Sequence, residues 1–187
     1  MEVYQQDFLY TPQHNALPEK GEYEQCTFTG ANWAKANLAG YVFRECVFTD
    51  CDLSMAYVKG TAFNEVQFTR CKLMGMRWDM CHAFLLSLVF TQCVLNFSSF
   101  YRLKLKGQQF TACQLQDVEF VEADLGHAVF TDCDLSRAVF EGTNLQGADF
   151  TTAQYFSIDP ELNTMTNARF ATHNVEGLLH KYRIHVL

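Results

Sequence analysis

The stretch VEFVEADLGHAVFTDCDLSRAVFEGTNLQGADFTTA, from Val118 to Ala153, decides the fold of this 187-residue chain. Every fifth residue in it is a phenylalanine or a leucine, and we call these residues centres: Phe120, Leu125, Phe130, Leu135, Phe140, Leu145 and Phe150. Two residues before each centre lies a smaller one: Val118, Ala123, Ala128, Cys133, Ala138, Thr143 and Ala148. A period of five fits neither an α-helical turn of about 3.6 residues nor the alternation of a strand, so we interpret the stretch as a structural repeat.

The repeat predicts a solenoid with square coils. A five-residue unit with one large and one small inward side chain cannot bury either alone, whereas four units close a turn of twenty residues that stacks on the next at roughly 4.8 Å. Residues twenty positions apart should then lie above one another. Phe110, Phe130 and Phe150, three identical residues at this spacing, suggest such a column.

The cysteines support the same spacing. Of eight, seven occupy the small inward position, Cys81 being the exception: Cys26, Cys46, Cys51, Cys71, Cys93, Cys113 and Cys133. We expect buried, reduced thiols rather than metal ligands, because no C-x-x-C motif occurs. Seven of the ten glycines lie two residues after a centre, where we expect the coil to turn its corners.

The register breaks once. From Trp78 to the next centre, Leu85, there are seven residues instead of five. We expect the two extra residues to bulge from an otherwise continuous coil within the segment DMCHAF, at Asp79, Met80, Cys81 and His82. Beyond the bulge, four outward residues are expected to form an exposed apolar patch: Leu86, Val89, Phe97 and Tyr101.

The two ends of the chain depart from the repeat. Residues 1–20 contain Pro12 and Pro18 and are predicted to be an N-terminal cap over the first coil. The repeat is assigned to residues 21–155. Residues 156–187 are predicted to contain a loop, in which Pro160 stops the ladder, then a short α-helix and an extended tail.

The predicted helix has one apolar face, because Val175, Leu178, Leu179 and Tyr182 follow the spacing i, i+3, i+4, i+7, with Asn174 as a candidate N-cap. This end offers more apolar residues than one coil end needs. We therefore predict that it joins two chains as a homodimer, the alternative being a simple lid. The predicted dimerisation residues are Val175, Leu178, Leu179, Tyr182, Ile184, Val186 and Leu187.

Composition argues against several classes of protein. A formal charge of −7 argues against a nucleic-acid binder held by phosphate contacts. The first ten residues do not resemble a signal peptide, and no run of eighteen apolar residues predicts a membrane span, so we expect a cytoplasmic protein. The six histidines are scattered and no phosphate-binding glycine motif occurs. We therefore expect a protein that is not an enzyme and has no cofactor or metal.

The acidic residues are distributed unevenly. Residues 107–161 hold ten acids and one base, a net charge of −9. Because chain position becomes height in a solenoid, these acids should form a belt near the C-terminal end. The belt either steers a positively charged partner, such as a protein groove that holds duplex DNA, or keeps an apolar rod soluble. The candidate partner-binding residues are Asp117, Glu119, Glu122, Asp124, Asp132, Asp134, Glu141 and Asp149.

The motifs AVFTDCDLSRAVFEGTNLQGADF resemble the pentapeptide repeat family, A(D/N)LXX, over roughly residues 21–155. The resemblance implies an all-β fold, a right-handed quadrilateral β-helix. The interrupted repeat and the tail IDPELN…HNVEGLLHKYRI resemble the branch that includes the Qnr-type quinolone-resistance proteins, the mycobacterial homologue MfpA and the microcin B17 immunity protein.

This second resemblance implies a dimeric DNA mimic that binds a type II topoisomerase, DNA gyrase or topoisomerase IV, and protects it from quinolone-like poisons or modulates it. The helix Val175–Tyr182 would dimerise, and the belt acids would meet the DNA saddle of the enzyme. Qnr proteins carry two projecting loops, whereas this chain has only the predicted bulge. The alternative is a generic interaction scaffold whose unrelated cytoplasmic partner uses the apolar patch.

Overall fold

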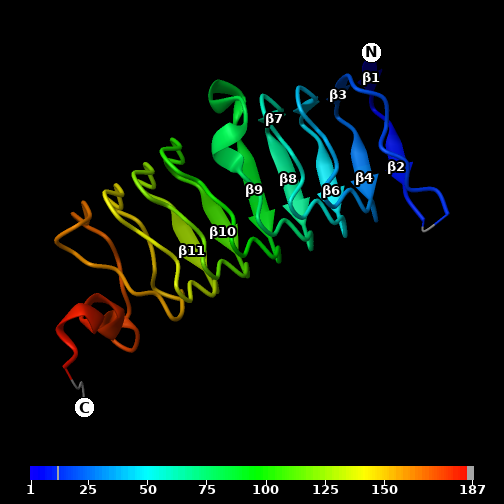
Figure 1. Ribbon diagram of the computed structural model, residues 1–187. Coiled ribbons are helices and arrows are strands. Elements are labelled where there is room, and N and C mark those ends of the chain that lie inside the picture. The colour runs from blue at the N-terminus through cyan, green and yellow to red at the C-terminus, as the bar shows by residue number, and fades with distance from the viewer. Residues whose placement is uncertain (12, 185–187) are drawn as a thin grey trace.

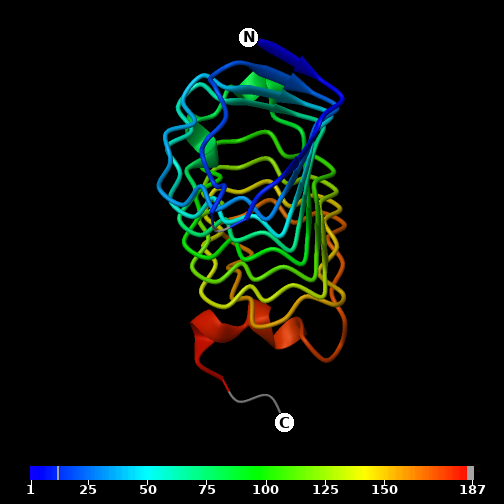
Figure 2. The ribbon, with the colours of Figure 1, turned by 90° about the vertical axis from the view of Figure 1, so that its right-hand side faces the viewer.

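In the computed structural model, which describes residues 1–11 and 13–184, the chain winds into a rod of stacked coils (Figure 1). Seen toward one end of the rod, successive coils follow similar four-sided outlines (Figure 2). Coils stack by parallel pairing of residues twenty apart, for example Phe110 with Phe130. The predicted solenoid with four-sided coils is therefore confirmed.

Two sides of the coil carry regular parallel strands. One sheet has the order β1-β3-β5-β7, with β1 (Glu2–Tyr4), β3 (Glu22–Glu24), β5 (Val42–Arg44) and β7 (Ala62–Asn64). The other sheet has the order β11-β10-β9-β8-β6-β4-β2, with β2 (Asp7–Leu9), β4 (Thr27–Thr29), β6 (Val47–Thr49), β8 (Val66–Thr69), β9 (Leu88–Thr91), β10 (Gln109–Thr111) and β11 (Val129–Thr131). Isolated parallel bridges, such as Glu119 with Val139, extend the stack on the remaining sides.

Each side of the coil has one column of centres, and we number the four faces in chain order from the seven-stranded sheet. The column of face 1 contains Phe28, Phe48, Phe68, Phe90, Phe110, Phe130 and Phe150. The column of face 2 contains Leu53, Leu73, Leu95, Leu115 and Leu135. The column of face 3 contains Val58, Trp78, Phe100, Phe120 and Phe140. The column of face 4 contains Tyr23, Phe43, Phe63, Leu105, Leu125 and Leu145.

Aromatic rings fill the interior of the rod in two directions. Along a column the rings stack, as Phe110 and Phe130 do with centroids 5.1 Å apart and planes 7° apart. Across the coil, Phe120 meets Phe130 edge to face, at 5.9 Å and 79°. Both arrangements are favourable for aromatic pairs, so each ring is held by neighbours above, below and beside it.

The residue two positions after a centre turns the corner of the coil with a left-handed backbone. The seven glycines expected there have φ between 65° and 74°: Gly30, Gly40, Gly60, Gly75, Gly107, Gly142 and Gly147. Other corners adopt the same conformation with side chains that carry a steric cost, including Met55 and Phe97. The corner geometry is thus set by the coil and not by glycine.

All eight cysteines have free thiols and are buried. Cys93 lies between Cys71 and Cys113, because the residues that follow these three cysteines pair with one another in two parallel bridges. Burial raises the pKa of the Cys46 thiol to about 12. The cysteine positions of the small inward columns therefore hold buried free thiols, as predicted.

The bulge begins later in the chain than predicted. The Gly60 amide donates to the carbonyl oxygen of Met80 at 2.9 Å, and the His82 amide donates to that of Thr61 at 2.9 Å. The short helix η1 (Trp78–Met80) therefore belongs to the coil. Of the predicted bulge residues, only His82 begins the bulge, and three remain in the coil: Asp79, Met80 and Cys81.

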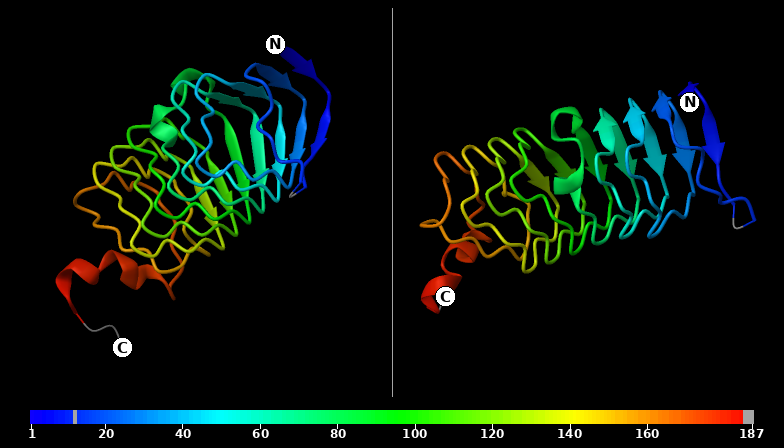
Figure 3. Two further views of the ribbon diagram at one scale, coloured as in Figure 1. Left: turned by 45° about the vertical axis from the view of Figure 1, so that its right-hand side comes forward. Right: turned by 45° about the horizontal axis from the view of Figure 1, so that its top comes forward.

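The physical reason for this correction is the burial of Cys81, which is only 7% exposed and fills a small inward position above Thr61. Val66 pairs with Leu88, so the spacing between paired residues is here two residues longer than the usual twenty. Between these points, η2 (Ala83–Leu85) stands out from the side of the rod in the green segment of Figure 3. Phe84 on η2 is 96% exposed.

The predicted N-terminal cap is itself part of the ladder. Strand β1 pairs with β3 and β2 with β4, each with partners twenty residues apart. Phe8 stacks on Phe28 at 4.9 Å. The expectation of a separate cap is therefore wrong for the first nine residues, because Val3 and Phe8 continue the columns of faces 4 and 1.

The ladder also continues past residue 155, where we expected a loop. Asn144 pairs with Thr164 and Asp149 with Arg169 in parallel bridges. The ring of Phe170 stacks on that of Phe150 at 5.2 Å. Pro160 lies in a turn between these pairings, so it interrupts the ladder without ending it.

The predicted α-helix is replaced by two 3₁₀ turns, η3 (Val175–Leu178) and η4 (His180–Tyr182), at the C-terminal end of the rod (Figure 3). The Gly177 carbonyl, which an α-helix would use internally, accepts the Ile158 amide at 3.0 Å. A side chain at Gly177 would also meet Phe156 at 2.5 Å. The last coil thus prevents an α-helix here.

Asn174, the predicted N-cap, caps the coil instead of the helix. Its side-chain amide donates to the carbonyl oxygens of Phe150 and Ala153, both at 2.9 Å, and its Oδ1 accepts the Ala171 amide at 3.0 Å. Tail residues Val186 and Leu187 lie outside the described residues.

Truncation of a stacked ring should be far more damaging than truncation of its outward neighbour. Phe130→Ala is expected to lower the free energy of unfolding by about 3–5 kcal/mol, because it opens a cavity between Phe110 and Phe150. Thr131→Ala should cost less than about 1 kcal/mol. Urea unfolding followed by circular dichroism measures both, and equal costs would contradict the register.

The bulge should be removable without loss of the stack. Deletion of Phe84 and Leu85 restores the twenty-residue period, so we expect a change in unfolding free energy of less than about 1 kcal/mol. Deletion of Asp132 and Cys133, two residues within a regular coil, shifts every later column and should abolish cooperative thermal unfolding. A similar loss in both deletion variants would mean that the bulge supports the fold.

Candidate functional site

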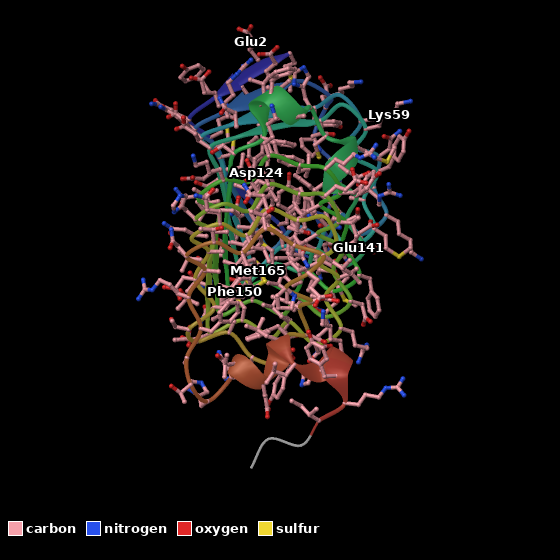
Figure 4. The ribbon with its side chains drawn as sticks, turned by 90° about the vertical axis from the view of Figure 1, so that its left-hand side faces the viewer. Glu2, Lys59, Asp124, Glu141, Phe150 and Met165 are labelled. Atoms are coloured by element: carbon pink, nitrogen blue, oxygen red, sulfur yellow. The ribbon has the colours of Figure 1, made fainter. Side chains whose placement is uncertain are left out.

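The eight predicted belt acids surround the rod instead of gathering on one side. Face 1 carries Asp149, the corner after it carries Asp132, face 2 carries Asp134 and face 4 carries Asp124, each placed by its distance from a centre. Face 3 and its two corners carry the other four: Asp117, Glu119, Glu122 and Glu141. Figure 4 shows Asp124 and Glu141 on separate parts of the outer surface.

Three belt acids immediately before a centre hold the local backbone. Asp124, Asp134 and Asp149 each accept a hydrogen bond from the amide two residues later, at 3.1, 2.9 and 2.9 Å. Burial acts against ionisation of Asp134, yet hydrogen bonds from Ser136 and Gln116 keep its pKa below the ordinary value. These carboxylates stabilise the corners of the coil through hydrogen bonds, and the same hydrogen bonds leave them poorly placed to bind a partner.

Ion pairs between neighbouring coils hold other acids. Arg102 lies 2.7 Å from Glu122, and its hydrogen bonds lower the pKa of that carboxyl. Arg137 lies 2.5 Å from Asp117 and has the same effect on its pKa. Because both arginines and Glu122 are exposed and Asp117 is partly exposed, each pair adds little stability, and an incoming cation can compete for the carboxylate.

Face 3 gathers further acids that sequence analysis did not assign to the site. Asp159 and Glu161 lie in the turn that follows this face in the next coil, and Asp159 lines a shallow hollow together with Glu141. Lys181 from η4 forms ion pairs with Asp159 at 2.6 Å and with Glu161 at 2.9 Å. We define the acidic face as Asp117, Glu119, Glu122, Glu141, Asp159 and Glu161.

Asp159 and Glu161 were counted in the acidic segment 107–161 but not among the candidate partner-binding residues; they flank Pro160 in the predicted loop, and the ladder resumes beyond it. The acidic face holds six carboxylates over three successive coils, and four arginine or lysine residues accompany it: Arg102, Arg137, Lys181 and Arg183, which lines the hollow of Glu141 and Asp159. Glu119 and Glu141 have no ion pair among the described residues. A net negative strip thus runs along one side of the C-terminal half of the rod.

The predicted apolar patch does not form as one surface. Leu86 packs against the core beside the bulge, and Val89 lies on face 1, where it is 43% exposed. Phe97, which is 60% exposed, turns the corner between faces 2 and 3, and Tyr101 lies on face 3. The four residues therefore form two separate pairs, Leu86 with Val89 and Phe97 with Tyr101, although they are close in sequence.

The C-terminal residues predicted to dimerise divide into two groups. Leu178 packs against the core and Leu179 is half-buried, so these two act within the chain. Val175, Tyr182 and Ile184 remain 39%, 54% and 56% exposed. Tyr182 donates a hydrogen bond to Glu161 at 3.2 Å, which ties η4 to the last coil.

The interior of the solenoid is filled by side chains, and the hollows found are shallow depressions of the outer surface. Within residues 1–11 and 13–184, no group of three or more histidine, cysteine or acidic side chains is arranged to hold a metal ion. No helix in the same part of the chain is both long and apolar enough to span a bilayer.

Known structures share this architecture. A trypsin-treated variant of QnrB1, described as a plasmid-mediated fluoroquinolone resistance protein, superposes with a TM-score of 0.66 at 15% identity, covering 100% of this chain and 98% of the QnrB1 chain. Full-length QnrB1 gives 0.57 at 14% identity, covering 98% and 100%. HetL from Nostoc sp. strain PCC 7120, a protein involved in heterocyst differentiation regulation, gives 0.52 at 16% identity, covering 90% and 82%.

No curated protein sequence matches this chain. Two family profiles do match. The profile described as "Pentapeptide repeat region" covers residues 81–150 and 103–178, and that described as "Pentapeptide repeats (8 copies)" covers residues 24–60. The stacked twenty-residue coils and these matches together show that the chain belongs to the pentapeptide repeat family.

Proposed function

We propose that this protein is a non-enzymatic binding rod whose acidic face enters the DNA-binding groove of a type II topoisomerase, either DNA gyrase or topoisomerase IV. The observation that carries the proposal is the strip of six carboxylates on face 3. Carboxylates repeated along a rigid rod offer a linear array of negative charge, as the phosphates of a duplex do. A groove lined with lysine and arginine attracts both.

The likeness to QnrB1 over the whole length supports this choice of partner, since QnrB1 is described as a fluoroquinolone resistance protein. At 15% identity the likeness shows the fold, and the proposed partner rests on the charge of face 3. A rod that occupies the DNA groove either inhibits the enzyme or displaces a poison that needs bound DNA. We propose protection from quinolone-like poisons as the outcome.

The rod should lengthen by pairing at its C-terminal end. Val175, Tyr182 and Ile184 are exposed there, and the acidic face reaches the same end through Asp159 and Glu161. Two chains joined in this way would place their acidic faces in the middle of a longer rod. The proposed homodimer thus doubles the length of the negative strip.

The topoisomerase proposal predicts a face-specific loss of activity. Wild-type protein should raise the quinolone concentration needed to inhibit gyrase supercoiling. The triple variant Glu119→Gln, Glu122→Gln, Glu141→Gln should need about ten-fold more protein for the same effect, because three carboxylates leave the groove. The control Glu24→Gln, Glu45→Gln, Glu65→Gln removes equal charge from face 4 and its corner and should act like wild type.

Equal loss in both triple variants would point to net charge rather than face 3, and an inactive wild-type protein at tens of micromolar would reject topoisomerase binding. A second function has one observation in its favour, the 96% exposure of Phe84 on the bulge. If the protein is a scaffold for an unrelated partner, Phe84→Ser should abolish capture of that partner while the face 3 variant retains it.

The dimer predicts a particle of twice the 21.5 kDa chain mass. Size-exclusion chromatography with light scattering measures it. The double variant Val175→Asp, Ile184→Asp should be monomeric, because each substitution places a charge in the apolar contact. Leu9→Asp, an exposed residue at the opposite end, is the matched control and should remain dimeric. A monomeric wild-type protein would end the dimer proposal.

A further inference from the structure

A shallow groove of about 440 Å³ lies at the N-terminal end of the acidic face, on the corner between faces 2 and 3. Phe97 and Tyr101 are its aromatic lining, and Ser99 lies between them in the chain. Asp117 and Glu119 line the groove from the following coil, and Arg77 lines it from the preceding one. The groove therefore combines aromatic rings with carboxylates.

Phe97 is not required by the fold. Its backbone has φ 62° and its side chain is 60% exposed, so it is a large apolar residue in a conformation that favours glycine. The neighbouring coils carry Gly75 and Asp117 at the same corner, and the coil turns equally well there. The ring thus adds strain and exposed apolar surface without contributing to the core.

The charges around the groove leave one carboxylate available. Arg77 is held by Asp79 through two hydrogen bonds of 2.8 and 2.6 Å, and Arg137 holds Asp117. Ser99 donates to Oε2 of Glu119 at 2.6 Å and so fixes this carboxylate. Among the described residues, no hydrogen bond or ion pair uses Oε1 of Glu119.

The other corner of face 3, between faces 3 and 4, already shows how an arginine fits. The Arg102 guanidinium lies 4.7 Å from the centroid of the Tyr101 ring while its nitrogens donate to Glu122 at 2.7 and 3.1 Å. Phe97 and Glu119 offer a ring and a carboxylate of the same kind, with the ring largely exposed. A planar guanidinium can lie flat on an aromatic ring while two of its N–H groups donate in parallel to one carboxylate, whereas an ammonium group has neither a flat face nor this fork of donors.

We propose that this groove receives an arginine side chain from the protein partner, stacked on Phe97 and hydrogen-bonded to Glu119. The inference rests on the proposed function in one respect, that the partner is a protein with a positively charged groove. The bound arginine would anchor the partner at one defined point at the edge of face 3. An apolar side chain would be a poor occupant, because it would remove the Glu119 carboxylate from water without a partner.

A peptide titration tests the anchor without any topoisomerase. The probe is acetyl-Gly-Arg-Gly-amide, compared with the lysine peptide and with the uncharged citrulline peptide, and the readout is the amide NMR shifts of Ser99 and Tyr101. We expect saturable shifts with the arginine peptide at millimolar concentration. The lysine peptide should bind at least about five-fold more weakly, and the citrulline peptide should give no saturable shift.

Three variants separate recognition from folding. Phe97→Gly and Glu119→Gln should each weaken arginine-peptide binding at least about five-fold. Phe97→Gly should not lower the melting temperature, because glycine relieves the left-handed corner. Met55→Gly is the matched control, since Met55 is 61% exposed at φ 57° on the same corner but outside the groove. It should bind like wild type.

Citrulline binding equal to arginine binding, or undiminished binding by Phe97→Gly, would overturn the anchor. In the gyrase assay, Phe97→Gly should reduce protection at least about five-fold relative to Met55→Gly. An inactive wild-type protein in that assay would reject the topoisomerase proposal, and the peptide titration would still decide the groove. If Phe97→Gly protects gyrase as fully as Met55→Gly and also binds the arginine peptide like wild type, the arginine anchor is rejected while the topoisomerase proposal stands.

Discussion

The structure depends on the pairing of each coil with the coil twenty residues further along the chain. A backbone amide in one coil finds its carbonyl acceptor in the next, as the Phe120 amide does with Val139 at 2.9 Å. This requirement fixes four sides of five residues, one large and one small inward side chain per side, and a left-handed corner between sides. It also explains why the chain absorbs two extra residues on face 4: they leave the coil, and every later column remains in place.

Much of the fold could be predicted from sequence, because the inward residues carry the period themselves. The phenylalanine column of face 1 and the cysteines at Cys71, Cys93 and Cys113 fixed the register and even the two-residue correction. The ends were predicted less well. Val3 and Phe8 continue their columns, but the prolines at positions 12 and 18 obscured this. The helix type at Gly177 could not be read from sequence, since it depends on a hydrogen bond from Ile158 in the last coil.

The candidate site was predictable only in part. Sequence position gives height along the rod, so the segment rich in acids was recognised. The side of the rod depends on the distance of each acid from a centre, which separates Asp124, Asp132, Asp134 and Asp149 from the acidic face. Which acids are free depends on contacts between coils, such as Arg137 with Asp117. The same arithmetic divides the apolar patch, because Val89 and Phe97 are eight residues apart and lie on different sides.

The left-handed corners have a consequence for divergence. Among residues 1–11 and 13–184, no non-glycine residue with positive φ is valine, isoleucine or threonine, the β-branched types that this conformation tolerates least, but acidic, basic, amide, aromatic and aliphatic side chains all occur there. Corners point outward and contribute nothing to the columns. The outward residues at the corners can therefore be substituted one at a time during evolution, so that the surface changes while the packed interior stays the same. Two such rods can keep one architecture at 15% identity and still meet different molecules.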